Sequence, residues 1–279
     1  MTDLLGPYEY DFFRNGVIVA MLAGALCGLV GVYVVLRGMS YIGHGLSHAI
    51  FGGFAASTLL GVNVFVGAGV WGVLSALSIT SVTRRRVIGS DAAIGVVTTA
   101  SFALGLALFA IWGQKGEAFD NALFGSILAV SGTDILRVGG VLLLASVLVF
   151  VAWRPLLFTT FDPDVAEVSG VRTGVIDAAL MLVLSLSILV TMQVLGVTLV
   201  AATLVIPPTV ARMLTSSFTR MLWLSVLIGA ASGFVGMNLS YHTDVQSGPT
   251  IVLVGTALFL VVFVLTGRRG LGRIAGLAH

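Results

Sequence analysis

The sequence contains long runs of apolar residues that no charged side chain interrupts, such as Gly16 to Leu36. Apolar residues make up 58% of the 279 residues and charged residues 9%. Soluble domains carry roughly 25% charged residues. With 14 basic and 12 acidic side chains, the chain could not cover a folded surface with charge. The composition therefore excludes both a soluble globular domain and a disordered chain, and indicates an integral membrane protein.

The length of the apolar runs favours helices over a membrane barrel. A spanning helix needs about 20 apolar residues, whereas a barrel strand needs about 10 residues of alternating character. We therefore predict a single all-α polytopic domain over residues 1–279, with about 8 or 9 transmembrane helices. The predicted segments are Gly16–Leu36, Tyr41–Leu60, Val62–Val82, Ala92–Trp112, Val138–Trp153, Val175–Leu195, Val197–Leu214, Met221–Leu239 and Ile251–Leu265.

The number of segments has alternatives. Tyr41–Leu60 carries two histidines and can be re-entrant, so eight or ten spans also fit the sequence. Asn121–Thr133 is mildly apolar and predicts a short interfacial helix. Glycine is abundant, with 35 residues, and pairs four apart occur at Gly24 and Gly28 and at Gly229 and Gly233. Such spacing fits close helix–helix contact in lipid.

The basic residues predict the orientation of the chain. With nine spans, eleven arginines fall on one side and Arg14, Lys115 and Arg137 on the other. Because basic residues concentrate in cytoplasmic loops, we expect residues 1–15 outside the cell. We expect residues 154–172 and the tail 267–279 in the cytoplasm. Asp3, Glu9 and Asp11 precede the first apolar run, unlike the basic start of a signal peptide, so this run is expected to be retained.

Two histidines stand out within an apolar segment. If the stretch is helical, His44 and His48 are four residues apart on one face. Two imidazoles at that spacing can share one divalent metal ion. The alternative is that each ring packs between helices and bonds a carbonyl or a hydroxyl. A metal ion near a helix N-terminus would also need a carboxylate or carbonyl ligand from elsewhere, because the helix dipole disfavours a cation there.

A second pair of possible ligands follows the eighth predicted span. His242 and Asp244 lie two residues apart in a short outer loop, just before Ser247-Gly248-Pro249. They are candidates to meet an arriving cation. A plain solvated loop explains them equally well.

The segment Phe161 to Gly170 has the signals of a short capped helix. Asp162 is suited to the N-cap, Pro163 to the first helical position and Gly170 to the terminator. Asp164 and Glu167 add negative charge, which is favourable near the N-terminus. Such a helix between two spans is either a connector or a docking element for a cytosolic partner.

Other polar and helix-breaking residues have more ordinary explanations. Pro207 and Pro208 are expected to kink or break their span, either for packing or to line a transport path. Asp91 and Asp177 stand near helix starts, which favours capping. The single cysteine, Cys27, excludes an internal disulfide.

The sequence lacks the motifs of several other classes. There is no G-x-x-x-x-G-K-[ST], H-E-x-x-H or G-x-S-x-G motif, which excludes these nucleotide-binding and hydrolase signatures. The cations are too dispersed to form a nucleic-acid footprint. The chain is therefore not expected to be an enzyme.

In their order, several motifs resemble the permease subunit of the manganese/zinc/iron class of bacterial ABC importers, the ABC-3 permeases. They are Arg37-Gly38-Met39-Ser40-Tyr41-Ile42-Gly43, Leu46-Ser47-His48-Ala49, Asp91-Ala92-Ala93-Ile94-Gly95, Leu123-Phe124-Gly125-Ser126-Ile127-Leu128, Phe161-Asp162-Pro163, Leu204-Val205-Ile206-Pro207-Pro208 with Ala211-Arg212, and Ser247-Gly248-Pro249-Thr250-Ile251-Val252. Single motifs are loose, but their order over about 220 residues is specific.

The resemblance implies a set of partners and a role. Two copies of the chain would form a pore in the bacterial inner membrane, over two cytosolic ATP-binding subunits. An extracellular metal-binding protein would deliver Mn²⁺, Zn²⁺ or Fe²⁺, with no tightly bound cofactor. The Phe161–Gly170 segment would be the coupling helix, and the fold would resemble the vitamin-importer type of permease, with short or interrupted helices.

One departure from the family pattern concerns the histidines. Many members carry Asp-Ala-Leu-Ser-His where this chain has His44-Gly45-Leu46-Ser47-His48. The resemblance therefore supports His48 more than His44 as a path ligand. A neutral nitrogen in place of a carboxylate oxygen favours Zn²⁺ or Fe²⁺ slightly over Mn²⁺.

Three rival functions stay open at this point. A permease for a metal chelate or a vitamin would have a wider pore and need no paired histidines. A secondary transporter would need an acidic coupling group within a span, for which Asp177 is the nearest candidate. An intramembrane enzyme would need a nucleophile–base pair, and the sequence offers none.

Overall fold

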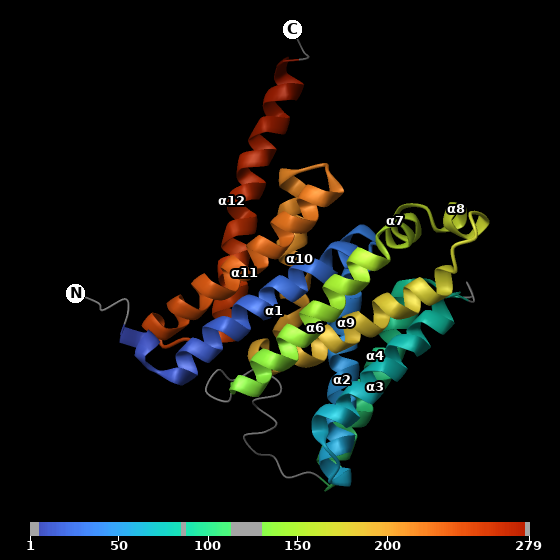
Figure 1. The fold of residues 1–279 in the computed structure, drawn as a ribbon, viewed down its shortest axis with the longest axis vertical. Coiled ribbons are helices and arrows are strands. Elements are labelled where there is room, and N and C mark those ends of the chain that lie inside the picture. The colour runs from blue at the N-terminus through green and yellow to red at the C-terminus, as the bar shows by residue number, and fades with distance from the viewer. Residues whose placement is uncertain (1–5, 85–87, 113–129, 277–279) are drawn as a thin grey trace.

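The computed structural model describes residues 6–84, 88–112 and 130–276, and every element in these residues is helical (Figure 1). The elements are η1 (Gly6–Glu9), α1 (Asp11–Leu36), α2 (Ser40–Leu60), α3 (Val64–Arg84), α4 (Ser90–Trp112), α6 (Gly132–Val151), α7 (Trp153–Phe161), α8 (Pro163–Val168), α9 (Thr173–Leu195), α10 (Val197–Leu214), α11 (Phe218–Thr243) and α12 (Ser247–Gly276). The prediction of an all-α polytopic protein is confirmed.

The predicted spans match nine of these helices. Seven are long and apolar enough to cross a membrane: α1, α3, α4, α6, α9, α11 and α12. The other two are α2, which is rich in glycine and polar residues, and α10, whose apolar part is shorter. Most of the interfacial helix predicted at Asn121–Thr133 lies outside the described residues.

The fifth predicted span differs from the structure at both ends. Helix α6 begins at Gly132, six residues before the predicted Val138, because Ser131 and Asp134 form a capping box. It ends at Val151, and α7 follows almost at once at Trp153. The apolar pattern missed the first turn because it is polar, and it joined two helices that are separate.

Helix α1 is the centre of the bundle and packs against α11, α10, α6 and α9. Its closest contact is with α11, through the two predicted glycine pairs. A Cβ atom at Gly24 would overlap the carbonyl oxygen of Gly229, and one at Gly229 would overlap that of Gly24. Ser225 adds a hydrogen bond of 2.7 Å from its hydroxyl to the carbonyl oxygen of Gly28. The expectation of close helix contact at these glycines is confirmed.

Helix α10 runs through Pro207 and Pro208 without a break in its assignment. The chain is instead interrupted at Gly196, between α9 and α10, where φ is +79°. Because proline has no N–H, the carbonyl of Leu204 lacks its usual helical donor at Pro208. The backbone of α1 lies against this carbonyl at Gly31, where a Cβ atom would overlap the Leu204 oxygen. The chain is therefore not broken at the prolines, and the interruption lies eleven residues before Pro207.

Candidate functional site

The two histidines of α2 meet on one face of the helix, as their spacing predicts. The Nε2 atoms of His44 and His48 are 3.1 Å apart, and the ring centroids are 4.4 Å apart at an interplanar angle of 89°. Two nitrogens bound to one tetrahedral metal at about 2.05 Å are about 3.3 Å apart. The pair is therefore already close to the geometry of two ligands on one ion. Without a metal, one Nε2 donates a hydrogen bond to the other.

The neighbouring helices hold this pair at close range. Gly45 lets Ile94 and Thr98 of α4 approach α2, because a Cβ atom at Gly45 would lie 2.7 Å and 3.0 Å from their methyl carbons. The ring of His48 packs on Phe102 of α4, at a centroid distance of 4.4 Å. Both imidazoles are half-buried. The position of the pair is therefore set by the packing of α2 against side chains of α4.

One nitrogen of the pair has no partner. The Nδ1 atom of His48 is buried and makes no hydrogen bond. A buried polar atom without a partner costs free energy, so its position calls for a function or a ligand. Among the described residues, no group of three or more His, Cys, Asp or Glu gathers at one point. The site thus offers two nitrogens and not a closed cage, which suits a cation that has to be released again.

The structure does not bring His242 and Asp244 to the histidine pair. Both are exposed at the end of α11, and the neighbouring Tyr241 packs on Phe13, near the start of α1. The pair on α2 follows the other end of α1, whose 26 residues span about 39 Å. Asp244 adopts a left-handed backbone with φ of +52° that ends α11. These two residues are a separate candidate at the far end of the bundle.

Helix α8 has the predicted caps. Asp162 Oδ1 accepts a hydrogen bond of 3.0 Å from the Val165 N–H, and Pro163 opens the helix. At the other end the N–H groups of Gly170 and Val171 donate to the carbonyls of Glu167 and Ala166. This is a Schellman motif, and Gly170 supplies its left-handed residue with φ of +81°.

The same helix offers an exposed surface at one edge of the bundle (Figure 1). Phe161, Val165 and Val168 are exposed, Val168 by 91%, while Ala166 is buried. Asp162, Asp164 and Glu167 are exposed around them. Exposed apolar side chains rimmed by acidic ones are typical of a surface that meets another protein.

The cap of α8 can be tested by itself. We expect Asp162→Ala to destabilise α8 by about 1 kcal/mol, because the Val165 N–H loses its acceptor. Hydrogen exchange should then be about fivefold faster at the Val165 amide. Asp162→Asn keeps an acceptor and should exchange like the wild type. Equal exchange in all three proteins would show that the cap does not stabilise the helix.

A cluster around Arg37 was missed at the sequence level. Its guanidinium donates to Asp177 at 2.7 Å, to Thr159 at 2.9 Å and to Thr160 at 3.2 Å. The capping role predicted for Asp177 is wrong, because α9 begins at Thr173 and Asp177 pairs with Arg37. A lone arginine at one span end and a lone aspartate inside another were the available signal.

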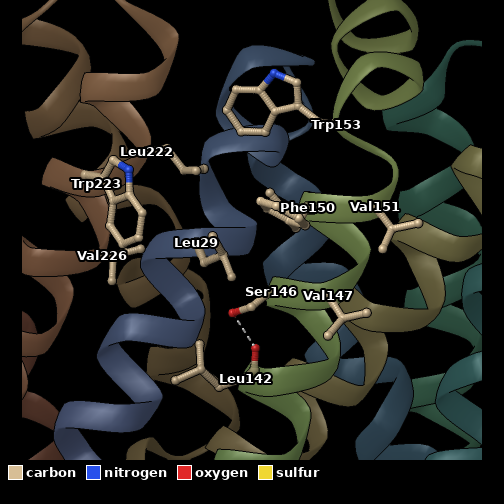
Figure 2. Close-up of a pocket in the computed structure, with 11 residues that line it drawn as sticks. Leu29, Leu142, Ser146, Val147, Phe150, Val151, Trp153, Leu222, Trp223 and Val226 are labelled. Carbon is tan, nitrogen blue, oxygen red and sulfur yellow. Dashed lines mark hydrogen bonds between the residues drawn. The ribbon is translucent and has the colours of Figure 1, made fainter.

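A large groove lies elsewhere in the described residues and is apolar. It has a volume of about 840 Å³ and lies between α1, α6 and α11. Figure 2 shows Leu29, Phe150 and Trp223 facing it. Its hydroxyl group, on Ser146, donates to the carbonyl of Leu142 at 2.8 Å. The groove therefore offers no ligand for a metal ion.

An all-helical membrane fold with an interrupted span and an exposed capped helix between two spans is typical of a transport permease. The chain belongs to the ABC 3 transport family, whose model matches residues 9–266. It is 37% identical, over 94% of its length and 90% of the relative, to the manganese transport system membrane protein MntC of Halalkalibacterium halodurans. It is 33% identical, over 92% of its length and 95% of the relative, to a Haemophilus influenzae protein named "Probable iron transport system membrane protein".

A solved structure agrees with the fold. A chain of PsaBC from Streptococcus pneumoniae, in complex with Fab, superposes with a TM-score of 0.83 at 34% identity. The match covers 92% of this chain and 93% of the other. The protein is therefore a multi-pass ABC transporter permease. The family resemblance at the sequence level is confirmed.

Proposed function

We propose that this permease imports a divalent transition metal ion, Mn²⁺ first and Fe²⁺ second, through a path that uses His44 and His48. The observation that carries the proposal is the 3.1 Å approach of the two Nε2 atoms on α2. The named functions of two relatives, manganese and iron transport, support the choice of metal. Zn²⁺, which the imidazole nitrogens alone would favour, is the third ion to test.

The histidines would act as transient ligands and not as a store. Two neutral nitrogens give a weaker site than a full tetrahedral cage, so an ion could leave on either side. His242 and Asp244 are exposed at the end of α11, far from the histidine pair. They would meet the ion at the outer entrance of the path. Because only neutral imidazole binds metal, we expect transport to weaken at acidic pH. Equal transport at pH 7.5 and 5.5 would contradict ligation by histidine.

The remaining parts of the proposal concern the assembly. Two copies of the chain, in the vitamin-importer type of arrangement, would stand over two ATP-binding subunits, and an extracellular metal-binding protein would load the pore. The exposed surface formed by Phe161 at the end of α7 and by Asp164 and Val168 of α8 would seat on the ATP-binding subunit. The N-terminus would lie outside and the C-terminus in the cytoplasm, as the arginine distribution favours.

The test is cellular metal content, measured by mass spectrometry in metal-starved cells. The chain would be expressed with its ATP-binding subunit and binding protein as wild type, His48→Ala and Ser47→Ala. Ser47 is a matched control, because it is buried on the same turn and bonds only the His44 carbonyl, at 2.8 Å.

We expect manganese or iron to rise with the wild type and with Ser47→Ala. With His48→Ala the rise should fall by at least about tenfold, since groups that merely orient a ligand already cost that much. If cellular manganese or iron still rises with His48→Ala at equal membrane abundance, the histidine pair only packs between helices and does not bind the ion. No rise in any metal would favour a metal chelate or vitamin as cargo.

A further inference from the structure

Arg37 lies at a junction between α2, which carries the histidine pair, and the segment formed by α7 and α8. It is the residue directly after α1 and stands three residues before α2 begins at Ser40. The turn between them passes through Gly38, whose φ is +68°. His44 follows Arg37 by only seven residues. Arg37 and the histidine pair are therefore joined by a short stretch of backbone that is hydrogen-bonded to the end of α1.

The guanidinium binds both helices that flank α8, namely α7 before it and α9 after it. Its Nη2 and Nε atoms donate to Thr159 and Thr160, at the end of α7, two or three residues before the Asp162 cap. Its Nη1 atom donates to Asp177, on α9, which carries the chain away from α8. The chain thus enters and leaves α8 through two helices that converge on one side chain.

Burial makes this junction stiff. The side chain of Arg37 is 10% exposed and that of Asp177 27%, and both threonines are buried. The planar guanidinium donates hydrogen bonds to three partners from three different nitrogens, whereas lysine has a single nitrogen. A cavity of about 90 Å³ lies beside the ion pair, between α9 and α3.

We propose that Arg37 is a positioning residue that transmits the movement of α8 to α2 and so links ATP hydrolysis to release of the ion. The inference rests on the proposed function, because it takes α8 as the element that the ATP-binding subunit moves. Arg37 touches no ion itself. Its side chain would make α7, α9 and the turn between α1 and α2 move together.

The experiment uses the full complex with its ATP-binding subunit, reconstituted in liposomes. Transport of Mn²⁺ and hydrolysis of ATP are measured in the same vesicles, and the result is metal moved per ATP. The variants are Arg37→Gln, Arg37→Lys and the double variant Thr159→Val with Thr160→Val. Arg137→Gln is the control, because Arg137 pairs with Asp134 of its own helix, α6, at 2.8 Å and otherwise lies over the ring of Phe65 on α3.

We expect Arg37→Gln to assemble and to hydrolyse ATP like the wild type, but to move about tenfold less metal per ATP. Arg37→Lys keeps the charge opposite Asp177 but cannot also reach both threonines. It should therefore behave like the double threonine variant, with an intermediate loss. Arg137→Gln should keep the wild-type ratio.

Two results would overturn the inference. Metal moved per ATP could stay unchanged in Arg37→Gln, or transport and hydrolysis could fall together with the amount of assembled complex, as for a purely structural residue. A wild-type complex that hydrolyses ATP but moves no Mn²⁺, Fe²⁺ or Zn²⁺ would overturn the proposed function itself, and the inference with it.

Discussion

Gly24→Leu should leave almost no folded permease in the membrane. The backbones of α1 and α11 touch at this point, and even a Cβ atom at Gly24 would overlap the carbonyl oxygen of Gly229. The same holds at Gly28, where a Cβ atom would lie 2.8 Å from the carbonyl carbon of Ser225. A leucine therefore has to separate the two helices. Since α1 is the most buried span, the expected cost exceeds about 5 kcal/mol, at the upper end for one substitution.

The measurement is the amount of monodisperse protein extracted in mild detergent, with its unfolding temperature. Gly140→Leu is the matched control, because Gly140 on α6 is exposed and nothing lies within 4 Å of its Cβ position. It should be neutral or stabilising by up to about 1 kcal/mol, since leucine is the better helix former. Equal yields of the two leucine variants would show that α1 and α11 do not need this contact.

The membrane helices could be predicted because each carries its own signal. Burial in lipid requires a run of apolar residues, and the helix ends at Leu36, Leu60, Trp112, Leu195 and Leu214 agree with the predicted ends. Errors occurred where polar residues belong to a helix. The first turn of α6 contains Asp134, which hydropathy excludes, although Ser131 and Asp134 together have the spacing of a capping box.

The histidine pair was predictable for a local reason. Residues four apart on a helix are neighbours wherever the helix lies, so His44 and His48 needed no tertiary information. The cluster of Arg37 is the opposite case. Its partners are 122, 123 and 140 residues away in sequence, and Asp177 alone already had a simple local explanation as a cap. Only the packing of α7 and α9 on the end of α1 joins them.

The prolines show why the position of a helix break could not be predicted from the sequence. Pro207 and Pro208 do remove two N–H donors, yet α10 continues through them. The sequence pattern could not reveal that Gly31 of α1 would lie against the carbonyl that Pro208 leaves free. The left-handed turn at Gly196 is the actual interruption, and a single glycine among 35 is too common to single out.

Val168→Asp should abolish association with the ATP-binding subunit without changing the fold of the permease. Val168 is 91% exposed at the end of α8, so a polar side chain there disturbs no core contact. In the proposed complex, however, this side chain would be buried against the partner, next to Asp162, Asp164 and Glu167. A fourth carboxylate would lose hydration on docking and face like charges. Loss of one well-buried contact residue costs about 2 kcal/mol or more, which weakens binding by at least about thirtyfold.

The measurement is retention of the ATP-binding subunit by the purified permease, followed by ATP hydrolysis of the recovered complex. Val62→Asp is the control, because Val62 is also an exposed valine, at 51%, and lies in the turn between α2 and α3, away from α8. It should retain the subunit fully, whereas Val168→Asp should lose it at unchanged unfolding temperature. If both aspartate variants kept the subunit, α8 would be a connector and the docking surface would have to lie elsewhere. If Val168→Asp also lowered the unfolding temperature, Val168 would have to contact the permease itself. The loss of the subunit could then come from unfolding and not from a lost docking contact.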